Sequence, residues 1–225
     1  MDEFFTSRLG IYDEHMLSEC EGVAEGYIEL ARHVPSETQA LLDLGCGTGL
    51  ELEEIFKVCP HVRVTGIDLT QAMLNSLHEK YSDRRVDLIC ANYLTYDFGL
   101  EVYDTAVSFE TMHHLTHDEK LALYVNILRA LKPGGRYIEG DYMAATQEEE
   151  DFCFAEYFRI RSGQNAARNE IYHYDTPCTV ENQIKLLLRA GFASAEKVWN
   201  KGATTIIIAK ALGRRAFADG FHLRR

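Results

Sequence analysis

Short apolar runs alternate along the chain with segments in which apolar residues recur every three to four positions, from about residue 40 onward. Continuous apolar runs are typical of buried strands, and the recurring pattern is typical of amphipathic helices. The predicted strands of this region span residues 39–45, 62–68, 86–92, 103–109 and 136–143. The predicted helices span residues 49–60, 70–81 and 117–135. Strands that alternate with helices predict a mainly parallel sheet with helices on both faces.

The C-terminal part of the chain departs from this alternation. After a predicted helix at 179–192, two strands at 193–199 and 203–211 are separated only by residues 200–202. Such a link is too short for a crossover helix, so we expect the two strands to pair as an antiparallel hairpin. The prediction is an α/β fold whose mainly parallel, seven-stranded sheet ends in a C-terminal antiparallel hairpin.

Two segments lie outside the predicted sheet and its helices. Residues 1–35 have a helical pattern, and residues 143–178 are rich in aromatic and acidic side chains. We expect both to be helical lid elements over the edge of the sheet where a ligand binds. The acidic run at 147–152 predicts a solvated helix start, because carboxylates suit the positive end of a helix dipole. Residues 1–212 are expected to form a single domain, and the basic tail at 213–225 is assigned no function.

Composition and charge narrow the range of partners. The chain has 225 residues, which suits one domain with a substantial core, and its formal net charge is −12. An acidic protein is not expected to bind nucleic acid or an anionic membrane unaided. Six scattered cysteines without a CxxC pair predict reduced thiols. With no secretion signal and no apolar run of about 18–20 residues, we expect a cytoplasmic protein, and we leave open whether it forms a homodimer.

Three glycines at alternate positions, Gly45, Gly47 and Gly49, directly follow the first predicted strand. In an open α/β sheet, ligands bind beyond the carboxyl ends of the strands, where the strand order reverses. Glycine lets the backbone turn tightly there and lets a ligand touch the main chain. The helix that begins next adds N–H groups that have no partner within the helix. The stretch therefore predicts a nucleotide-type binding loop.

The residues around this loop indicate which kind of nucleotide it binds. The dinucleotide pattern G-x-G-x-x-G requires a glycine where this chain has Leu50. The carboxylate of Asp43, two residues before the glycines, would repel a pyrophosphate and suits a positive amino group. Asp68 ends the second strand, at the spacing where a carboxylate accepts hydrogen bonds from ribose hydroxyls. The sequence thus predicts a phosphate-free nucleoside that carries an ammonium group.

Four motifs carry a resemblance to a known family: LLDLGCGTG at 41–49, VTGIDLTQAML at 64–74, ANYLTYDF at 91–98 and LKPGG at 131–135. Together they resemble the class I S-adenosylmethionine-dependent methyltransferases of the small-molecule type. The resemblance covers residues 38–212 and includes the terminal antiparallel hairpin. It implies a Rossmann-like fold, S-adenosylmethionine as cofactor, and transfer of a methyl group to a small-molecule acceptor by in-line displacement.

The resemblance also implies positions for the cofactor. The residues under its methionine part would be Gly45, Cys46, Gly47 and Gly49, with Asp43 near the amino group. Asp68 would hold the ribose hydroxyls, and Leu69 and Met73 would flank the adenine. The alternatives are that the two aspartates cap turns, that Cys46 is only a small residue in a tight loop, and that Met73 belongs only to the core.

Further contacts are implied at the other side of the cofactor. Asn92, where the family often has aspartate, would bond the adenine amino group, and the main chain at Tyr93 would reach the ring. Glu110 would lie beside the sulfonium, and Tyr12, in a segment that resembles the family's N-terminal lid, would close over the carboxylate or methyl region. The alternatives are that Asn92 caps a turn and that Tyr12 anchors the lid by packing.

A general base is needed only if the acceptor must lose a proton. Candidates follow the fourth and fifth predicted strands, and they are His113, His114, His117, Asp141 and Tyr142. Of these we expect His113 to be the catalytic residue that faces the acceptor. His113 and His117 have an i, i+4 spacing, but the helix begins after them, so we expect no shared helical face and no metal site.

Three alternative functions stay open at this point. The segment 174–199 also resembles relatives that make or use a carboxylated form of the cofactor in transfer RNA wobble-base modification. Such a protein would need an arginine for the extra carboxylate, and Arg159, Arg161 and Arg168 are the candidates. A non-catalytic S-adenosylmethionine-binding module is the second alternative. A nicotinamide-dependent oxidoreductase is the third, and both Leu50 and the terminal hairpin oppose it.

Overall fold

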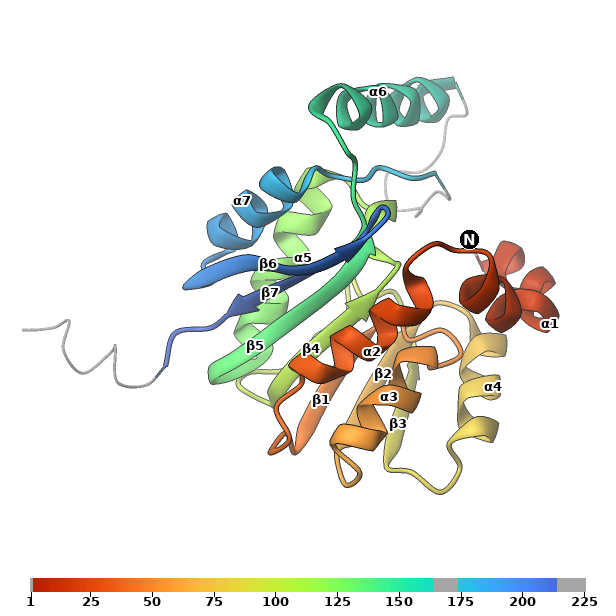
Figure 1. Cartoon of the computed structure of the whole chain (residues 1–225), viewed down its shortest axis with the longest axis vertical. Helices are drawn as coiled ribbons and strands as arrows, with labels where there is room; N and C mark the ends of the chain where they lie inside the picture. The colour runs from red at the N-terminus through yellow and green to blue at the C-terminus, as the bar shows by residue number, and fades with distance from the viewer. Residues whose placement is uncertain (1, 164–173, 214–225) are drawn as a thin grey trace, which may run out of the picture.

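A twisted sheet forms the centre of the molecule (Figure 1). The computed structural model describes residues 2–163 and 174–213, and in these residues the sheet has seven strands in the order β3-β2-β1-β4-β5-β7-β6. The strands are β1 (Ala40–Leu44), β2 (Arg63–Asp68), β3 (Val86–Cys90), β4 (Tyr103–Phe109), β5 (Leu131–Tyr142), β6 (Ser194–Lys201) and β7 (Thr204–Lys210). Only β7 runs antiparallel to its neighbours, β5 and β6. The predicted fold class, with its C-terminal antiparallel hairpin, is confirmed.

Helices cover both faces of this sheet (Figure 1). The helices are α1 (Asp2–Ser18), α2 (Val23–His33), α3 (Leu50–Val58), α4 (Gln71–Lys80), α5 (His117–Ala130), α6 (Gln147–Gly163) and α7 (Val180–Ala190), with a short 3-10 turn η1 (Met112–His114). Helices α2, α3 and α4 pack on one face, and α5 and α7 pack on the other. The strand order reverses between β1 and β4, so the carboxyl ends of these two strands mark the expected ligand edge.

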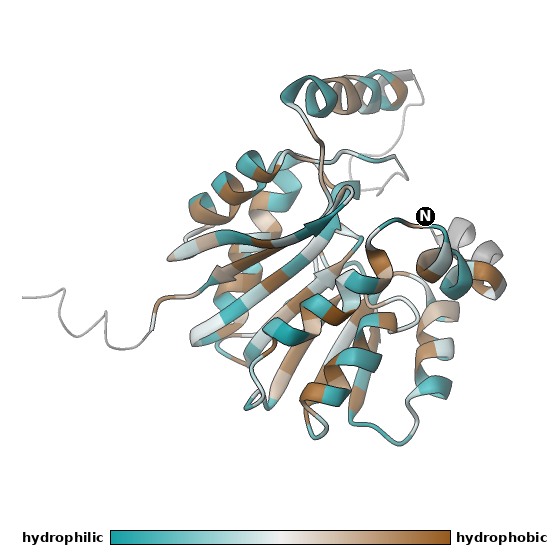
Figure 2. Cartoon of the chain, in the orientation of Figure 1, coloured by the Kyte–Doolittle hydropathy of each residue, from teal (hydrophilic) through white to brown (hydrophobic). Residues whose placement is uncertain are grey.

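Two hydrophobic clusters lie on opposite sides of the sheet because successive strand residues point to opposite faces. Leu41 of β1 and Val107 of β4 belong to the cluster under α2 and α3. Leu42 and Ala106, one position away, belong to the cluster under α5 and α7. Figure 2 shows the matching division on the helices, whose ribbons alternate between hydrophobic and hydrophilic residues. Both faces of the central strands are therefore buried, as their continuous apolar runs predict.

The boundary between α5 and β5 differs from the prediction. The helix ends at Ala130 and the strand begins at Leu131, whereas the sequence pattern extends the helix to 135. Pro133 explains the early end, because a proline disfavours helical conformation at the residue before it and cannot donate within a helix. Leu131 pairs with Tyr103 of β4, and the register then shifts before Thr105 pairs with Arg136.

The helix α6 lies beyond the carboxyl ends of the strands, at the top of Figure 1. The prediction of a solvated acidic start is wrong for Glu150, which is only 1% exposed. Its Oε2 accepts a hydrogen bond from the backbone N–H of Thr179 at 2.6 Å, and its Oε1 accepts one from Nδ2 of Asn182 at 2.9 Å. The carboxylate thus occupies the N-terminus of α7, where backbone donors and the helix dipole stabilise it.

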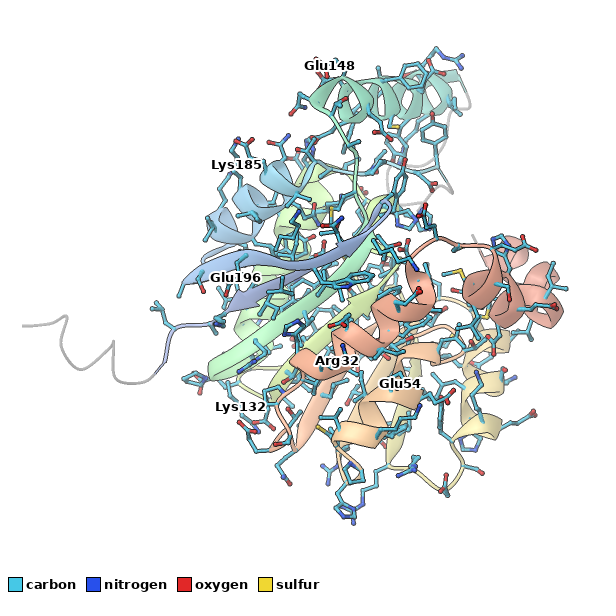
Figure 3. All side chains as sticks on the ribbon, in the orientation of Figure 1. Arg32, Glu54, Lys132, Glu148, Lys185 and Glu196 are labelled. Atoms are coloured by element: carbon cyan, nitrogen blue, oxygen red, sulfur yellow. The ribbon has the colours of Figure 1, made fainter. Side chains whose placement is uncertain are left out.

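Charged side chains on the outside of the fold point into solvent. Figure 3 labels six of them, among them Arg32 on α2, Glu54 on α3 and Lys185 on α7. Exposed ion pairs of this kind, such as Lys57 with Glu54, contribute little to stability. In the part of the chain that the structure describes, no helix is both long and apolar enough to cross a bilayer. Of the predicted lid at 143–178, residues 164–173 lie outside the described residues, as does the tail from 214 onward.

Candidate functional site

The turn between β1 and α3 is built on glycines in the left-handed region. Gly45 has a φ of 71°, Gly47 of 47° and Gly49 of 74°, which side-chain-bearing residues rarely adopt. At Gly45 space is limiting as well, since a Cβ there would lie 2.6 Å from Oγ1 of Thr111. The N–H of Gly45 donates to the carbonyl of Ile67 at 2.8 Å, and the N–H of Gly47 donates to Oδ2 of Asp68 at 3.0 Å. The turn is therefore held against the end of β2.

A cavity opens above this turn at the point where the strand order reverses. Its lining includes these predicted residues: Tyr12, Gly45, Gly47, Asp68, Leu69, Met73, Tyr93 and Glu110. Thr70, Thr111 and His114 complete the lining. The other predicted residues, Asp43, Cys46, Gly49, Asn92 and His113, do not line it. Segments that are far apart in the sequence, from α1 to the end of β4, thus meet at one edge of the sheet.

Two buried carboxyl groups, Asp43 of β1 and Glu51 of α3, lie on either side of the glycine turn in the sequence. Asp43 is fully buried in β1, where its polar neighbour is the carboxyl of Glu51, and no backbone N–H or basic side chain of the described residues bonds to its oxygens. Burial, together with the neighbouring carboxyl of Glu51, raises the pKa of Asp43 well above its ordinary value. Burial likewise raises the pKa of Glu51 to about 7. A buried carboxyl without a donor is costly, and a positively charged ligand group nearby would relieve that cost.

Asp68 lines the cavity at the end of β2, and its oxygens accept backbone N–H groups. One of its oxygens accepts the N–H of Gly47, and the other accepts the N–H of Thr70 at 2.8 Å. The Thr70 side chain and the Leu69 backbone also hydrogen-bond to this carboxylate, which lines the cavity. Burial raises the pKa of Asp68, while these backbone donors act in the opposite direction.

Three predicted residues have a structural role beside any contact with a ligand. Cys46 is 1% exposed, and burial raises the pKa of its thiol well above the ordinary value, which does not suit a nucleophile. Met73 is 2% exposed and both packs in the interior and lines the cavity. Oδ1 of Asn92 accepts the N–H of Leu94 at 2.9 Å, so this side chain caps the turn after β3. Its contact with an adenine stays a prediction.

A histidine–aspartate pair lies next to the cavity. Nδ1 of His113 lies 2.6 Å from Oδ1 of Asp141, and the two side chains are 9% and 1% exposed. Burial lowers the pKa of His113, but Asp141, with Glu110 and Asp175 near it, outweighs burial and raises this pKa to about 9. The strands β4 and β5 are adjacent and parallel, which brings the residues that follow them together.

Glu110 sits directly after β4 in an unusual backbone conformation, with a φ of 48°. Its Oε1 accepts the hydroxyl of Thr204 at 3.3 Å, and its Oε2 lies 3.7 Å from Nδ1 of His113. Burial and the charge of Asp141 raise the pKa of Glu110 to about 7. A non-glycine residue held in this region often marks a functional site, because such a conformation costs free energy.

The structure adds residues that the sequence did not single out. Thr111 lines the cavity, and its Oγ1 lies 3.1 Å from the hydroxyl of Tyr93. His114, considered only as one of several candidates, lines the cavity, and its Nδ1 lies 3.3 Å from Oδ1 of Asp175. Asp175 is 61 positions away from His114, and no local pattern in the sequence could have paired them.

His117 does not meet His113 as a metal pair would require. Its Nε2 lies 2.9 Å from Oε1 of Glu150, and its ring stacks on Phe154 of α6 with centroids 4.2 Å apart. The helix α5 begins at His117, behind a capping box formed by Thr116 and Glu119. The i, i+4 spacing therefore spans a 3-10 turn and a helix start, and the two rings face different parts of the molecule.

Comparisons with known proteins agree with this geometry. A family described as "Methyltransferase domain" matches residues 41–135, which run from β1, through the glycine turn, into β5. Residues 41–135 of the chain are therefore similar to a methyltransferase domain. The matched segment includes the glycine turn and Asp68 at the end of β2.

Two relatives and one solved structure illustrate the similarity. The chain is 26% identical over 171 residues to phosphoethanolamine N-methyltransferase of Plasmodium falciparum, which covers 72% of this chain and 63% of that protein. It is 32% identical over 111 residues to 24-methylenesterol C-methyltransferase 2 of Arabidopsis thaliana, covering 47% of this chain and 29% of that protein. The chain thus spans less than two thirds of the length of these relatives.

The fold is also that of a solved methyltransferase. Human N-acetylserotonin methyltransferase in complex with S-adenosylmethionine superposes with a TM-score of 0.67 at 15% identity, covering 94% of this chain and 57% of that one. At this identity the likeness shows the fold alone. The comparisons support neither the carboxylated-cofactor alternative nor the non-catalytic module.

Proposed function

We propose that the protein binds S-adenosylmethionine in the cavity above the glycine turn and transfers its methyl group to a small-molecule acceptor. The observation that carries this proposal is Asp43, a fully buried carboxyl beside that of Glu51, to which no backbone N–H or basic side chain of the described residues bonds. A cofactor with an amino group and no phosphate suits that carboxylate, whereas a pyrophosphate would be repelled by it. Asp68, a carboxylate that lines the cavity at the end of β2, suits the ribose diol of the same cofactor.

The chain's own residues would bind the cofactor and keep water away. The glycine turn would present its backbone to the methionine part, and Leu69 and Met73 would flank the adenine. Tyr12, from α1, would cover the opposite side. When bound, the cofactor supplies an electrophilic methyl carbon, so alignment and exclusion of water provide much of the acceleration.

His113 is the proposed general base. Because Asp141 holds the Nδ1 side of the ring, Nε2 is the atom that would accept a proton from the acceptor. Asp141 would then stabilise the imidazolium that forms. The raised pKa of His113, about 9, means that the unliganded site holds this ring protonated at neutral pH. A cationic cofactor beside Glu110 would oppose that protonation and lower the pKa toward the working range.

The nature of the acceptor is left to experiment, because the relatives differ. They include an enzyme named for N-methylation of phosphoethanolamine, one named for C-methylation of a sterol and one named for O-methylation of a malonyl-acyl-carrier protein. A cytoplasmic location and a homodimer stay predictions.

A labelled-methyl screen tests the proposal. The protein is incubated with S-adenosylmethionine labelled on the methyl group and with fractions of a metabolite extract, and label in each fraction is measured. We expect transfer to a small molecule, and loss of transfer in an Asp68→Ala variant. Retained cofactor binding without transfer to any fraction would contradict the enzymatic function and favour a binding module.

A further inference from the structure

One carboxylate on α1 joins the lid helix to the glycine turn. Oδ1 of Asp13 accepts a hydrogen bond from the hydroxyl of Thr48 at 2.5 Å. Its Oδ2 accepts one from Nζ of Lys80 at 2.8 Å. Thr48 lies within the glycine turn, between Gly47 and Gly49, and Lys80 is the last residue of α4. Asp13 therefore joins three segments that are distant in the sequence, and Figure 1 shows α1 beside α4.

The position of Asp13 determines where its neighbour Tyr12 lies. Tyr12 lines the cavity, and a Cβ built on Gly47 would be 3.8 Å from its hydroxyl. Consecutive residues of a helix point about 100° apart, so one can face the cavity while the next faces the turn and α4. A movement of the α1 backbone that takes Asp13 away from Thr48 carries Tyr12 with it, because the two residues are adjacent in the helix.

The other anchors of the turn come from the body of the domain. The N–H of Gly47 is held by Asp68 at the end of β2, and the carbonyl of Gly49 accepts the hydroxyl of Tyr81, just after α4, at 2.9 Å. These bonds keep the turn in place whether or not α1 is docked. Met16, farther along α1, is 8% exposed and packs in the hydrophobic cluster on the α2 face. Loss of the Asp13 contacts would thus release the part of α1 around Tyr12 without unfolding the turn.

We propose that Asp13 is a positioning residue that keeps α1 closed over the cofactor site, so that its bonds to Thr48 and Lys80 set how slowly the cofactor and its demethylated product leave. This inference rests on the proposed function. Thr48 is 2% exposed, so its hydroxyl depends on Asp13 as an acceptor, and a hydrogen bond to a charged group is among the stronger ones. The ion pair with Lys80 is partly exposed, with side chains 31% and 40% exposed, and we expect it to contribute less.

The test compares variants of the three partners with a neighbour on the same helix. Asp13→Leu removes both contacts, Asp13→Asn keeps an acceptor for Thr48 but loses the ion pair, and Thr48→Val removes only the hydroxyl. Glu14→Gln is the matched control, because Glu14 is exposed on the same turn of α1. The measurements are the dissociation rate of S-adenosylhomocysteine by stopped flow and amide hydrogen exchange of α1 in the unliganded protein.

We expect Asp13→Leu to raise the dissociation rate about tenfold, the factor that a charge-assisted hydrogen bond supports. Thr48→Val should come close to this, and the double variant should be no faster than Asp13→Leu alone, because the two changes remove one shared bond. Asp13→Asn should fall between wild type and Asp13→Leu, and Glu14→Gln should match wild type. Exchange of α1 should be faster in Asp13→Leu at an unchanged melting temperature.

Two results would overturn the inference. One is an unchanged dissociation rate and unchanged α1 exchange in Asp13→Leu. The other is a double variant whose dissociation rate rises by the product of the two single-variant factors, which would show that Asp13→Leu and Thr48→Val act independently. If the wild-type protein binds neither compound, the proposed function fails, and the exchange of α1 in the unliganded variants then decides the positioning role separately.

Discussion

Nδ1 of His113 lies 2.6 Å from Oδ1 of Asp141, although the two residues follow different strands and are 28 positions apart. The same carboxylate oxygen accepts the backbone N–H of Tyr142 at 3.0 Å, which fixes its orientation. In the neutral ring, a carboxylate beside Nδ1 keeps the proton on that nitrogen and leaves Nε2, which lies 3.8 Å from Oδ1 of Asp175, for proton transfer. The parallel pairing of β4 with β5 therefore brings together the two residues of the proposed base.

Replacing the imidazole tests its role in turnover. We expect His113→Asn to lower kcat about a hundredfold, the lower end of what a general base contributes, because the variant lacks the imidazole proposed to take the proton from the acceptor. The dissociation constant for S-adenosylmethionine should stay near the wild-type value, since His113 does not line the cavity. Asp141→Asn should lower kcat as well. An unchanged rate of His113→Asn at saturating acceptor would remove this residue from the mechanism.

The pH dependence of the reaction follows from the same pair. The pKa of His113 is raised from 6.5 to about 9, so the unprotonated base becomes abundant only as pH rises toward 9. We expect kcat/KM, which reports the free enzyme, to rise with pH up to that value, and Asp141→Asn to shift the rise to lower pH. A rate that falls from pH 6.5 upward would contradict the base role.

The same pKa shift makes a prediction about stability. Protonated His113 stabilises the folded state, so this contribution is fully present below pH 6.5 and is lost as pH rises through about 9. Urea titration measures the free energy of unfolding of wild type and of His113→Asn. We expect wild type to be the more stable of the two only below about pH 9. A difference that grows with pH would contradict the assignment.

Much of this fold follows from local sequence patterns. The apolar runs at 39–45 and 103–109 gave β1 and β4, and the three-residue link at 200–202 gave the antiparallel pairing of β6 with β7. The pattern predicts an end of α5 at the glycines of the PGG motif. The helix ends earlier, at Ala130, because Pro133 disfavours helical conformation at the residue before it.

The sequence predicts those site residues whose place follows from their position next to a strand or turn. Gly45 and Asp68 stand at fixed positions relative to their strands, so pattern and spacing find them. Asp175 and Glu150 could not be found in this way, because their partners, His114 and Thr179, are brought to them by the packing of separate segments. The burial of Glu150 could not be predicted for a related reason. A carboxylate near a helix start is favoured by the helix dipole both in water and against another helix, so its presence does not tell the two cases apart.

Cofactor binding should depend on pH through the buried acids. The pKa of Glu51 is raised from 4.5 to about 7 by burial, so the Asp43–Glu51 pair gains negative charge as pH rises through about 7. We expect affinity for S-adenosylmethionine, measured by calorimetry, to increase over this range because the cofactor's ammonium group gains a charged partner.

The variant Glu51→Gln separates this effect from titration of the cofactor itself. The cofactor's own amino group titrates identically with both proteins, so the difference between wild type and Glu51→Gln reports Glu51 alone. We expect the variant to show a weaker rise in affinity with pH. Parallel curves for the two proteins would argue against coupling between the buried pair and the ligand.

The attachment of α6 should depend on Glu150. Replacing it with alanine leaves the partly buried N–H of Thr179 without its acceptor, whereas the amide of Asn182 keeps Oε1 of Gln147, and loss of an acceptor costs about 1–3 kcal/mol. We expect Glu150→Ala to lower the free energy of unfolding in urea by that order, and Glu148→Ala, an exposed neighbour on the same helix turn, to have little effect. Equal stability of both variants would contradict the anchoring role.

Calorimetric titration of the purified protein with S-adenosylmethionine, S-adenosylhomocysteine and NAD tests the central claim most directly. The account predicts that the first two bind, that NAD does not, and that Asp68→Ala and Gly45→Ala each weaken binding strongly, since they remove the ribose acceptor and the space of the turn. Binding of NAD in the absence of any binding of the two sulfur compounds would contradict it.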